Sequence, residues 1–332
     1  MSYKEAISHH FTGINDSTLR EGEQYNGSEF SIDDQKEILR LLNSIGVDTV
    51  EVGNPIVPEI NRDLRVLTQV ADRPPLMAHI RNKDSDLAAA LDVHVDGVHI
   101  LCTADPSRLD NMHVSLEEHI ANMVQNVRHA QGEKLTVRVS VEHGLEERFF
   151  VDALKILKVA DSLGVDRVQV ADTRGVLFPW DIEKIIQTLR KEIQTHIGVH
   201  LHNDLGHATS NAILALAAGA NWVDTTLIGV GERTGITPLS ALLVNLNGIN
   251  PQLVERYALS LLTSAEQQMA DILNIPMPHN LITSPTAFSH KAGIHVNGLK
   301  KQGTATYEAI DPELVGNERV IVTDSRISGR KQ

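Results

Sequence analysis

Residues 44–52 read SIGVDTVEV, and residues 162–170 repeat the pattern as SLGVDRVQV. In both segments a helical stretch ends at a glycine and a short valine-rich strand follows at once. Glycine just beyond a helix accommodates the left-handed turn that ends it. A strand that is apolar on both faces is typical of a buried parallel sheet. Residues 217–229, AAGANWVDTTLIG, follow the same pattern, which indicates a chain built from repeated strand–helix units.

Eight such strands are expected along the 332 residues, with helical segments between them. In the clearest helix, 31–46, Ser31 and Asp34 suit a capping box and Ile38, Leu42 and Ile45 share one apolar face. The expected strands are 12–19, 48–53, 76–80, 97–101, 136–141, 167–171, 198–201 and 222–228. Eight units in series favour a closed (β/α)8 TIM barrel over a doubly wound open sheet, which usually has fewer strands.

The chain changes character after the eighth expected strand. Residues 239–273 are rich in helical patterns, whereas residues 275–332 are rich in Pro, Gly, His and Lys and hold no strong amphipathic helix. We therefore expect a catalytic barrel with its following helices in residues 1–273. Residues 274–332 are expected to form an irregular or helical C-terminal tail, packed on the barrel or on a neighbouring subunit.

Composition narrows the classes of function. A net charge of -13 disfavours a nucleic-acid surface, which needs clustered Lys and Arg. Cys102 is the single cysteine, so a disulfide framework within the chain is excluded and a reducing compartment is expected. The first residues lack an apolar segment, and no long apolar run follows. These features argue against a signal peptide and against a membrane span. The sequence therefore predicts a cytoplasmic protein.

Polar side chains follow nearly every expected strand, at the face where a TIM barrel builds its active site. His200 and His202 stand two apart in VHLHND, so their side chains point to the same side of the strand. With Glu21 of STLREGEQ they would form a two-histidine, one-carboxylate metal site with open positions. The alternative for a single histidine is a hydrogen-bonded core residue, and the paired spacing favours a metal.

Three further clusters leave alternatives open. Arg138, Ser140 and Glu142 alternate along one strand, which fits either an internal Arg138–Glu142 ion pair or a clamp on a substrate carboxylate. The glycine-rich segment 227–235 could receive a phosphate or a pantetheine arm. In the tail, SHKAGIH (289–295) with Tyr307 is either a solvated turn or catalytic chemistry supplied from outside the barrel.

Seven short motifs together resemble the Claisen-condensing subgroup of the DRE-TIM metallolyases, the homocitrate, isopropylmalate and citramalate synthases. Among these, the pattern is most similar to the homocitrate synthases, and it spans essentially the whole chain. The motifs are DSTLREGEQ (16–24), RVSVEHG (138–144), ADTRGV (171–176), HLHND (200–204), GVGERTGITPL (229–239), FSHKAGIH (288–295) and SRISGR (325–330).

The resemblance implies an acyltransferase that joins acetyl-CoA to the ketone of a 2-oxo acid and then hydrolyses the thioester. It implies a divalent metal (Zn, Mg or Mn), with acetyl-CoA as co-substrate, and a homodimer in which the tail histidine comes from the partner subunit. It also implies the following roles: Glu21, His200 and His202 as metal ligands, Arg20 at the developing alkoxide, Gln24 near the same oxygen, Thr173 at the first carboxylate, and Glu142, His295 and Tyr307 in deprotonating the acetyl methyl group.

The same resemblance assigns His79, Arg138 and Ser140 to the distal carboxylate of 2-oxoglutarate. A buried arginine facing an apolar group would lack a partner, so we expect a second anionic group on the substrate. The segment EVGNP (51–55) departs from the family pattern, and Arg81 and Lys83 add positive charge near the pocket rim. Oxaloacetate, and phosphonopyruvate as in phosphonate biosynthesis, therefore remain alternative substrates.

Three other classes of function are weighed against this one. A two-histidine, one-carboxylate oxygenase is disfavoured by the repeated strand–helix units. A retro-aldol lyase of the same superfamily would need a tail cysteine, and residues 274–332 contain none. A non-catalytic barrel that only binds an oxo acid would not need the tail His and Tyr.

Overall fold

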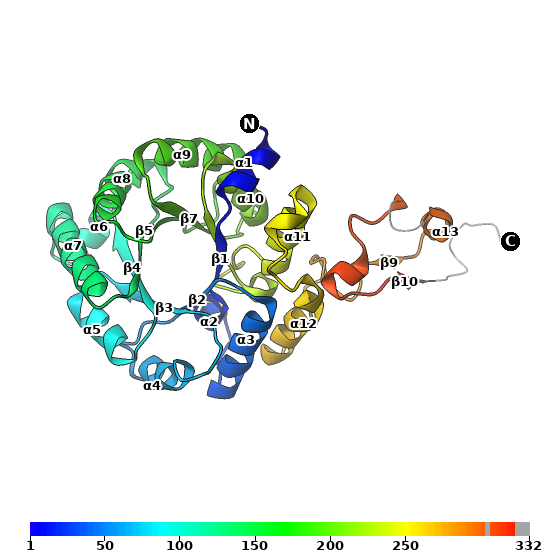
Figure 1. Ribbon diagram of the computed structural model, residues 1–332, viewed down its shortest axis with the longest axis horizontal. Coiled ribbons are helices and arrows are strands. Elements are labelled where there is room, and N and C mark those ends of the chain that lie inside the picture. The colour runs from blue at the N-terminus through cyan, green and yellow to red at the C-terminus, as the bar shows by residue number, and fades with distance from the viewer. Residues whose placement is uncertain (303–305, 323–332) are drawn as a thin grey trace.

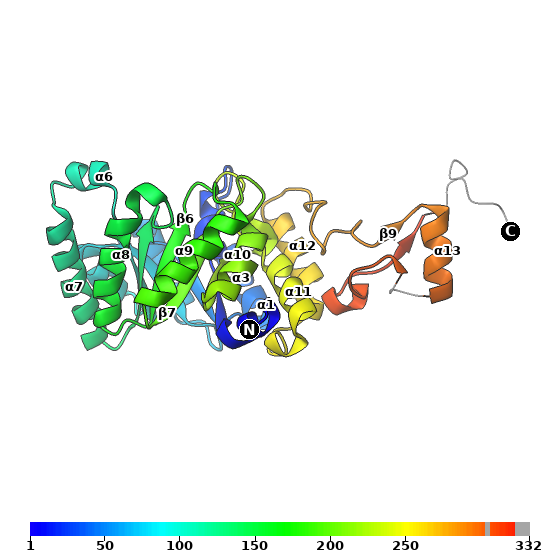
Figure 2. The same ribbon diagram turned by 90° about the horizontal axis from the view of Figure 1, so that it is seen from above.

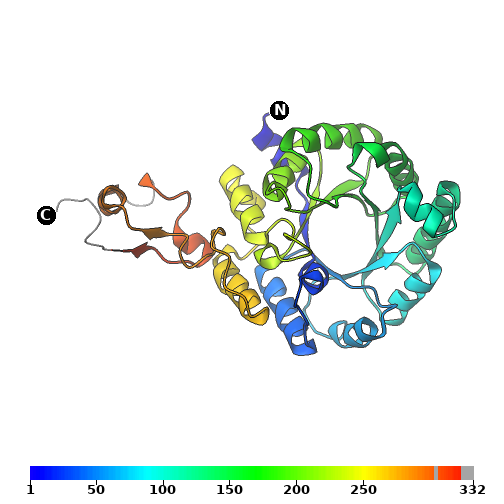
Figure 3. The same ribbon diagram turned by 180° about the vertical axis from the view of Figure 1, so that it is seen from behind.

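Eight parallel strands close into a barrel in the computed structural model, which describes residues 1–302 and 306–322. The strands are paired in chain order, and β1 closes the ring by pairing with β8. Figures 1 and 3 show this ring from its two sides, with helices around it. The strands are β1 Gly13–Asp16, β2 Thr49–Val52, β3 Leu76–Arg81, β4 Gly97–Thr103, β5 Thr136–Glu142, β6 Arg167–Asp172, β7 His196–Leu201 and β8 Trp222–Thr225. The predicted TIM barrel is confirmed.

Helices precede, connect and follow the strands, and most of them cover the outside of the barrel (Figure 1). They are α1 Tyr3–His10, α2 Thr18–Glu21, α3 Ile32–Ile45, α4 Pro58–Leu67, α5 Asp84–Asp92, α6 Pro106–Asn111, α7 Leu116–Gly132, α8 Glu147–Ser162, α9 Pro179–Glu192, α10 Ala208–Ala218, α11 Leu239–Ile249 and α12 Leu262–Ile272. The capping box of α3 is confirmed, because Asp34 N–H donates to Ser31 Oγ and Ser31 N–H donates to the Asp34 carboxylate. Gly46 ends this helix in the left-handed conformation, with φ of 91°. Helix α1, which packs against α10, was not expected from the sequence.

Two of the expected strands are too long, and both differences affect the barrel mouth. The first strand ends at Asp16 rather than at residue 19, because the Asp16 carboxylate accepts a hydrogen bond from Thr18 N–H at 2.9 Å and the chain turns into α2. The eighth strand ends at Thr225, and a 3-10 turn, Leu227–Gly229, follows. Arg20 and Glu21 therefore lie on a helical turn above β1 rather than on the strand itself.

Successive side chains of a strand point to opposite faces, so that apolar side chains pack against the helices and polar side chains point into the barrel. In β5, Val139 belongs to the buried apolar cluster shared with the surrounding helices, whereas Arg138 points inward and contacts Glu51 of β2 and Asp224 of β8. Side chains two residues apart share a face, so Ser140 faces inward as well. Within residues 1–302 and 306–322, no helix is both long and apolar enough to cross a membrane.

The tail extends away from the barrel beyond α12 (Figures 1 and 2). Its strand β9, Ser289–His290, pairs in parallel with β10, Val320–Ile321, beside helix α13, Gly293–Gln302. The sequence did not predict α13. The motif at 325–330 lies outside the described residues.

Candidate functional site

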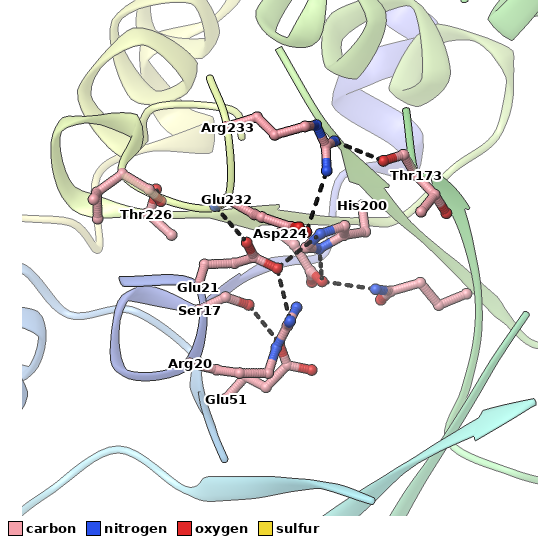
Figure 4. A network of polar contacts seen from close by, with 12 residues as sticks. Ser17, Arg20, Glu21, Glu51, Thr173, His200, Asp224, Thr226, Glu232 and Arg233 are labelled. Atoms are coloured by element: carbon pink, nitrogen blue, oxygen red, sulfur yellow. Dashed lines mark hydrogen bonds and ion pairs between the residues drawn. The ribbon is translucent and has the colours of Figure 1, made fainter. Parts of the chain in front are cut away.

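Glu21, His200 and His202 converge at the mouth of the barrel. Each offers one ligand atom, and these atoms lie within 4.8 Å of one another. His200 stands in β7 and His202 just beyond it, while Glu21 ends α2. His200 Nε2 lies 3.3 Å from Glu21 Oε1, and its Nδ1 lies 3.0 Å from Asp224 Oδ2 (Figure 4). Asp224 thus orients the imidazole so that Nε2 faces Glu21, as carboxylates orient metal-ligating histidines in proteins.

The glycine-rich loop between β8 and α11 packs directly on the Glu21 carboxylate. A Cβ atom at Gly231 would lie 2.9 Å from Glu21 Oε2, which is too close for a side chain at this position. The next residue, Glu232, donates its N–H to the same oxygen at 3.4 Å. Gly235 takes φ of +76°, and a Cβ there would overlap the carbonyl oxygen of Gly229. The loop glycines therefore allow the chain to close over Glu21.

The electrostatics of these three residues suit a divalent cation. Burial alone would raise the pKa of Glu21, but the neighbouring Arg20 and His200 hold it well below its usual range, so the group is a carboxylate. Burial lowers the pKa of His202 to about 4, which leaves a neutral imidazole. His202 Nδ1 is buried without a hydrogen-bond partner among the described residues. One carboxylate and two imidazoles with open positions fit a divalent metal.

Metal binding at this site should release one proton near neutral pH. Burial opposes charge on His200, yet its hydrogen bonds with Asp224 and Glu21 raise its pKa to about 9. Below that pH a metal must displace the His200 proton, so affinity should rise about tenfold per pH unit between about pH 7 and 9. Titration calorimetry of the metal into metal-free protein, in buffers of different ionisation enthalpy, would count the released proton. Release of none at pH 7.5 would contradict this assignment.

Arg20 lies between Glu21 and a second buried carboxylate, Glu51. Its Nη1 is 2.7 Å from Glu21 Oε1 and its Nε donates to Glu51 Oε2 at 2.6 Å (Figure 4). Ser17 Oγ also donates to Glu51 Oε2, at 2.7 Å. These contacts fix the guanidinium beside the metal-ligand cluster, although burial itself disfavours its charge.

The Arg138–Glu142 ion pair, one of the two alternatives that the sequence left open, is not formed in the structure. Arg138 contacts Glu51 and places Nη1 3.0 Å from Asp224 Oδ1, while Glu142 pairs with Arg108 at 2.6 Å. Arg138 is almost fully buried and is neutralised by carboxylates from strands on two other sides of the barrel. It therefore does not need a substrate anion as its partner, contrary to the expectation from the sequence.

Two residues of the barrel interior, Asp224 and Glu51, were not predicted from the sequence as part of the site. Asp224 accepts hydrogen bonds from Asn15 Nδ2 at 3.0 Å and Gln169 Nε2 at 2.7 Å, besides its contacts with Arg138 and His200. Glu51 and Asp224 are the single charged residues of two buried strands, TVEV and WVDT. A charged residue in a strand that is buried on both faces needs a partner, and this signal could have identified both residues.

A second group, Glu51, His79 and His99, also brings ligand atoms within 4.8 Å of one another. Arg20 and Arg138 both contact the Glu51 carboxylate, so a cation there would face two positive guanidiniums. The cluster that contains Glu21 is therefore the better metal site.

The remaining expected site residues are distributed around the mouth. His79, Arg20 and Gln24 line a cavity of about 760 Å³ that extends outward between the ends of β1 to β3 and helices α3 and α4. Thr173 Oγ1 accepts from His143 N–H at 3.0 Å, and Thr173 O accepts from Arg233 at 2.8 Å. Burial raises the pKa of Glu142.

His295 and Tyr307 stay apart from the barrel residues within one chain. Their rings stack in the tail, with centroids 4.0 Å apart. His290 Nε2 contacts Glu308 at 3.0 Å in the same region. Helix α13, which carries His295, lies away from the barrel in Figure 2, and the Tyr307 ring stacks on His295, so this pair is remote from the barrel of its own chain.

Comparison with known proteins gives two family matches. A model described as HMGL-like matches residues 12–269, and a model described as homocitrate synthase post-HMGL domain-like matches residues 282–332. The mitochondrial homocitrate synthase of Schizosaccharomyces pombe is 34% identical over 320 residues, which cover 95% of this chain and 76% of that protein. The homocitrate synthase of Sulfurisphaera tokodaii is 36% identical over 324 residues, 94% of this chain and 69% of that protein. An HMG-CoA lyase structure from Bacillus subtilis superposes with a TM-score of 0.71 at 17% identity, covering 82% of this chain and 96% of that one.

Proposed function

The chain belongs to the HMGL-like family, and from that premise we propose that it is an acyltransferase that condenses acetyl-CoA with 2-oxoglutarate, a homocitrate synthase. Relatives named homocitrate synthase, similar over nearly the whole chain, support this substrate pair. The observation that carries the proposal is the convergence of Glu21, His200 and His202 within 4.8 Å, beside the Arg20 guanidinium.

Glu21, His200 and His202 would hold a divalent metal, either Zn, Mg or Mn. Such a metal supplies Lewis acidity, which polarises the ketone of a 2-oxo acid. Arg20 donates hydrogen bonds to the oxygen that becomes an alkoxide as the new carbon–carbon bond forms. Gln24 would lie near the same oxygen, and Thr173 would bind the carboxylate next to the ketone. Asp224 acts through His200 by fixing its orientation.

A proton must leave the methyl group of acetyl-CoA before the bond can form. We assign this proton transfer to Glu142, His295 and Tyr307 together. The raised pKa of buried Glu142 supports a role in proton exchange, since such groups work best near the operating pH. The methyl carbon then attacks the ketone carbon, and water hydrolyses the thioester, which releases CoA and the hydroxy acid.

The second anionic group of the oxo acid would lie toward β3 and β5. His79 and Ser140 would donate hydrogen bonds to it, and so would Arg138 through its Nε–H, which has no partner among the described residues. Oxaloacetate and phosphonopyruvate are the alternative substrates, because each carries a second anionic group at a different distance from the ketone.

Release of CoA from acetyl-CoA, with an added divalent metal, tests the proposal across five oxo acids. These are 2-oxoglutarate, oxaloacetate, phosphonopyruvate, 2-oxoisovalerate and pyruvate. Preference for 2-oxoglutarate supports the proposal, while preference for oxaloacetate or phosphonopyruvate keeps the chemistry and changes the substrate. Preference for 2-oxoisovalerate contradicts the assignment of the distal group, and turnover of none of the five contradicts the proposed function.

We further propose that residues 274–332 act as a tail unit that completes the active site of a partner subunit in a homodimer. The support is that the stacked His295–Tyr307 pair lies outside its own barrel. We also propose a cytoplasmic location, which the single free thiol of Cys102 supports.

Mixing two inactive variants should restore activity if tails are exchanged. His295→Ala lacks the tail histidine, and Glu21→Ala lacks a metal ligand, so neither homodimer has an intact site. After the subunits re-associate at random, half of the dimers hold one intact site, and about a quarter of wild-type CoA release should return. A mixture that stays as inactive as its components would show that each site is built from one chain.

A further inference from the structure

A buried glutamate on helix α12, Glu266, has no part in the proposed chemistry. Its side chain is fully buried, and its carboxylate accepts four hydrogen bonds. The donors are Ile228 N–H at 3.3 Å, Ser240 N–H at 3.3 Å, Ser240 Oγ at 2.9 Å, and Thr283 Oγ1. Burial raises the pKa of Glu266, and the four donors oppose this effect because they favour the carboxylate form. One side chain therefore joins three separate segments of the chain.

Both ends of the loop between β8 and α11 are held by one oxygen of this carboxylate. Oε1 accepts from Ile228 near the start of the loop and from Ser240 in the first turn of α11. The N-cap residue of α11 is Pro238, which provides no side-chain cap, so Glu266 satisfies an N–H group at the start of this helix. The shape of the loop is thus fixed by a residue from a different helix.

The backbone of Ile228 makes the loop dependent on such contacts. Ile228 has φ of 52° and ψ of 7°, a conformation that favours glycine. A positive φ at a β-branched residue costs about 1–3 kcal/mol and persists only where the surrounding structure holds it. The hydrogen bond from Ile228 N–H to Glu266 is one contact that holds it, and the burial of the Ile228 side chain is another.

The same loop contacts the metal-ligand cluster at two places. Gly231 packs against the Glu21 carboxylate, and Glu232 N–H donates to the same carboxylate. Farther along the loop, Ile236 forms an antiparallel bridge with His202. The loop therefore contacts one ligand from the turn after β1 and one from the end of β7, and its position affects how the two lie relative to each other.

We propose that Glu266 is a positioning residue for the metal site, which holds the β8–α11 loop closed on Glu21 and His202. This inference rests on the proposed function, because it takes these two residues as metal ligands. Glu266 acts through the loop. Thr283 in the tail unit donates to the same carboxylate, so the loop and the tail unit meet at one side chain.

Three variants of Glu266 separate its acceptor atoms from its charge and its volume. Glu266→Ala removes all four contacts. Glu266→Gln keeps an oxygen that can accept from the N–H groups of Ile228 and Ser240, and the hydroxyls of Ser240 and Thr283 can turn to accept from its amide. Glu266→Asp keeps the charge but is one methylene shorter, so it cannot reach all four donors.

Asp271→Asn is the matched control on the same helix. Its side chain is exposed and accepts from Gln267 Nε2 at 2.9 Å. This variant changes a carboxylate of α12 to an amide without any contact with the loop.

The measurements are the Kd values of Zn²⁺, Mn²⁺ and Mg²⁺ by titration calorimetry, together with amide hydrogen exchange of residues 226–238 in the metal-free protein. Both are made well below the melting temperature of each variant. For Glu266→Ala we expect the metal Kd to rise about tenfold or more and the loop to exchange about tenfold faster or more. Exchange in residues 116–132 of α7 should not change. Glu266→Gln and Asp271→Asn should stay within about threefold of wild type, with Glu266→Asp between them and Glu266→Ala.

A lower melting temperature for Glu266→Ala, with unchanged metal Kd and unchanged loop exchange, would show a structural role only and would overturn the proposal. Glu266→Gln as weak as Glu266→Ala would overturn it as well, because the loop would then not be held through acceptor atoms. If Glu266→Ala does not fold, Glu266→Asp decides, and wild-type metal affinity in that variant counts against the proposal. Failure of the wild-type protein to bind any of the three metals would instead contradict the proposed function.

Discussion

Replacing Glu21 with alanine should remove the bound metal and the condensation activity together, with CoA release reduced about a thousandfold or more. Glu21 contributes the only carboxylate of the cluster and also contacts Arg20 at 2.7 Å. Without it, His200 and His202 alone bind a divalent metal weakly, and Arg20 loses one of its two anionic partners. The metal content is measured after gel filtration, and CoA release is measured on the same preparation, so that both effects are checked together.

Glu232→Ala is the matched control for this experiment. Glu232 follows the loop residue that packs on Glu21, but its own side chain is half exposed and pairs with Arg233. Its variant should keep the metal and most of the rate, because only its backbone N–H contacts Glu21. If Glu21→Ala kept the full metal content and the full rate, the assignment of the metal site would be wrong.

Replacing Glu51 with glutamine should lower the free energy of unfolding by about 3–5 kcal/mol, which corresponds to a melting temperature lower by about 4–7 °C for a chain of this length. Glu51 is fully buried, and its carboxylate accepts from Ser17, Arg20 and Arg138. Glutamine keeps the shape but loses the charge, so two buried guanidiniums face a neutral amide. Thermal and urea unfolding of the metal-free protein measure the effect without any contribution from activity.

Glu37→Gln on α3 provides the comparison for Glu51→Gln. Glu37 also pairs with an arginine, Arg40, but at the surface, with the Arg40 side chain 58% exposed. Surface pairs of this kind contribute about 0–1 kcal/mol, so its melting temperature should stay close to wild type. Equal melting temperatures for the two variants would mean that the interior charges are solvated or rearranged.

The fold could be predicted because its signals are local. A glycine after a helix and a valine-rich strand, as at Gly46 and β2, depend on neighbouring residues alone. The ends of β1 and β8 were misplaced because the local turn at Asp16 and Thr18 is combined with contacts between residues that are distant in sequence. Thr18 Oγ1, for example, accepts a hydrogen bond from Leu227 N–H at 2.9 Å, and this contact joins the first and last units of the barrel.

The same difference between local and distant signals applies to the residues of the candidate site. His200 and His202 could be paired from their spacing on one strand, and Glu21 followed from the barrel order. The partners of Arg138 could not be identified, because Glu51 precedes it by 87 residues and Asp224 follows it by 86. Sequence spacing suggested the near residue, Glu142, and only barrel closure brings the true partners together.

The polar interior also has a consequence for how the chain reaches its native state. Asp224 of β8 contacts Asn15 of β1, Arg138 of β5 and Gln169 of β6, so strands from the beginning, middle and end of the chain meet at one carboxylate. A partly assembled barrel that lacks β8 would hold Arg138 with one of its two counterions missing. Burying that charge is costly, so intermediates with fewer strands are disfavoured and the barrel should assemble late and cooperatively. Fragments cut at the middle of the chain are therefore expected to fold only when both halves are present.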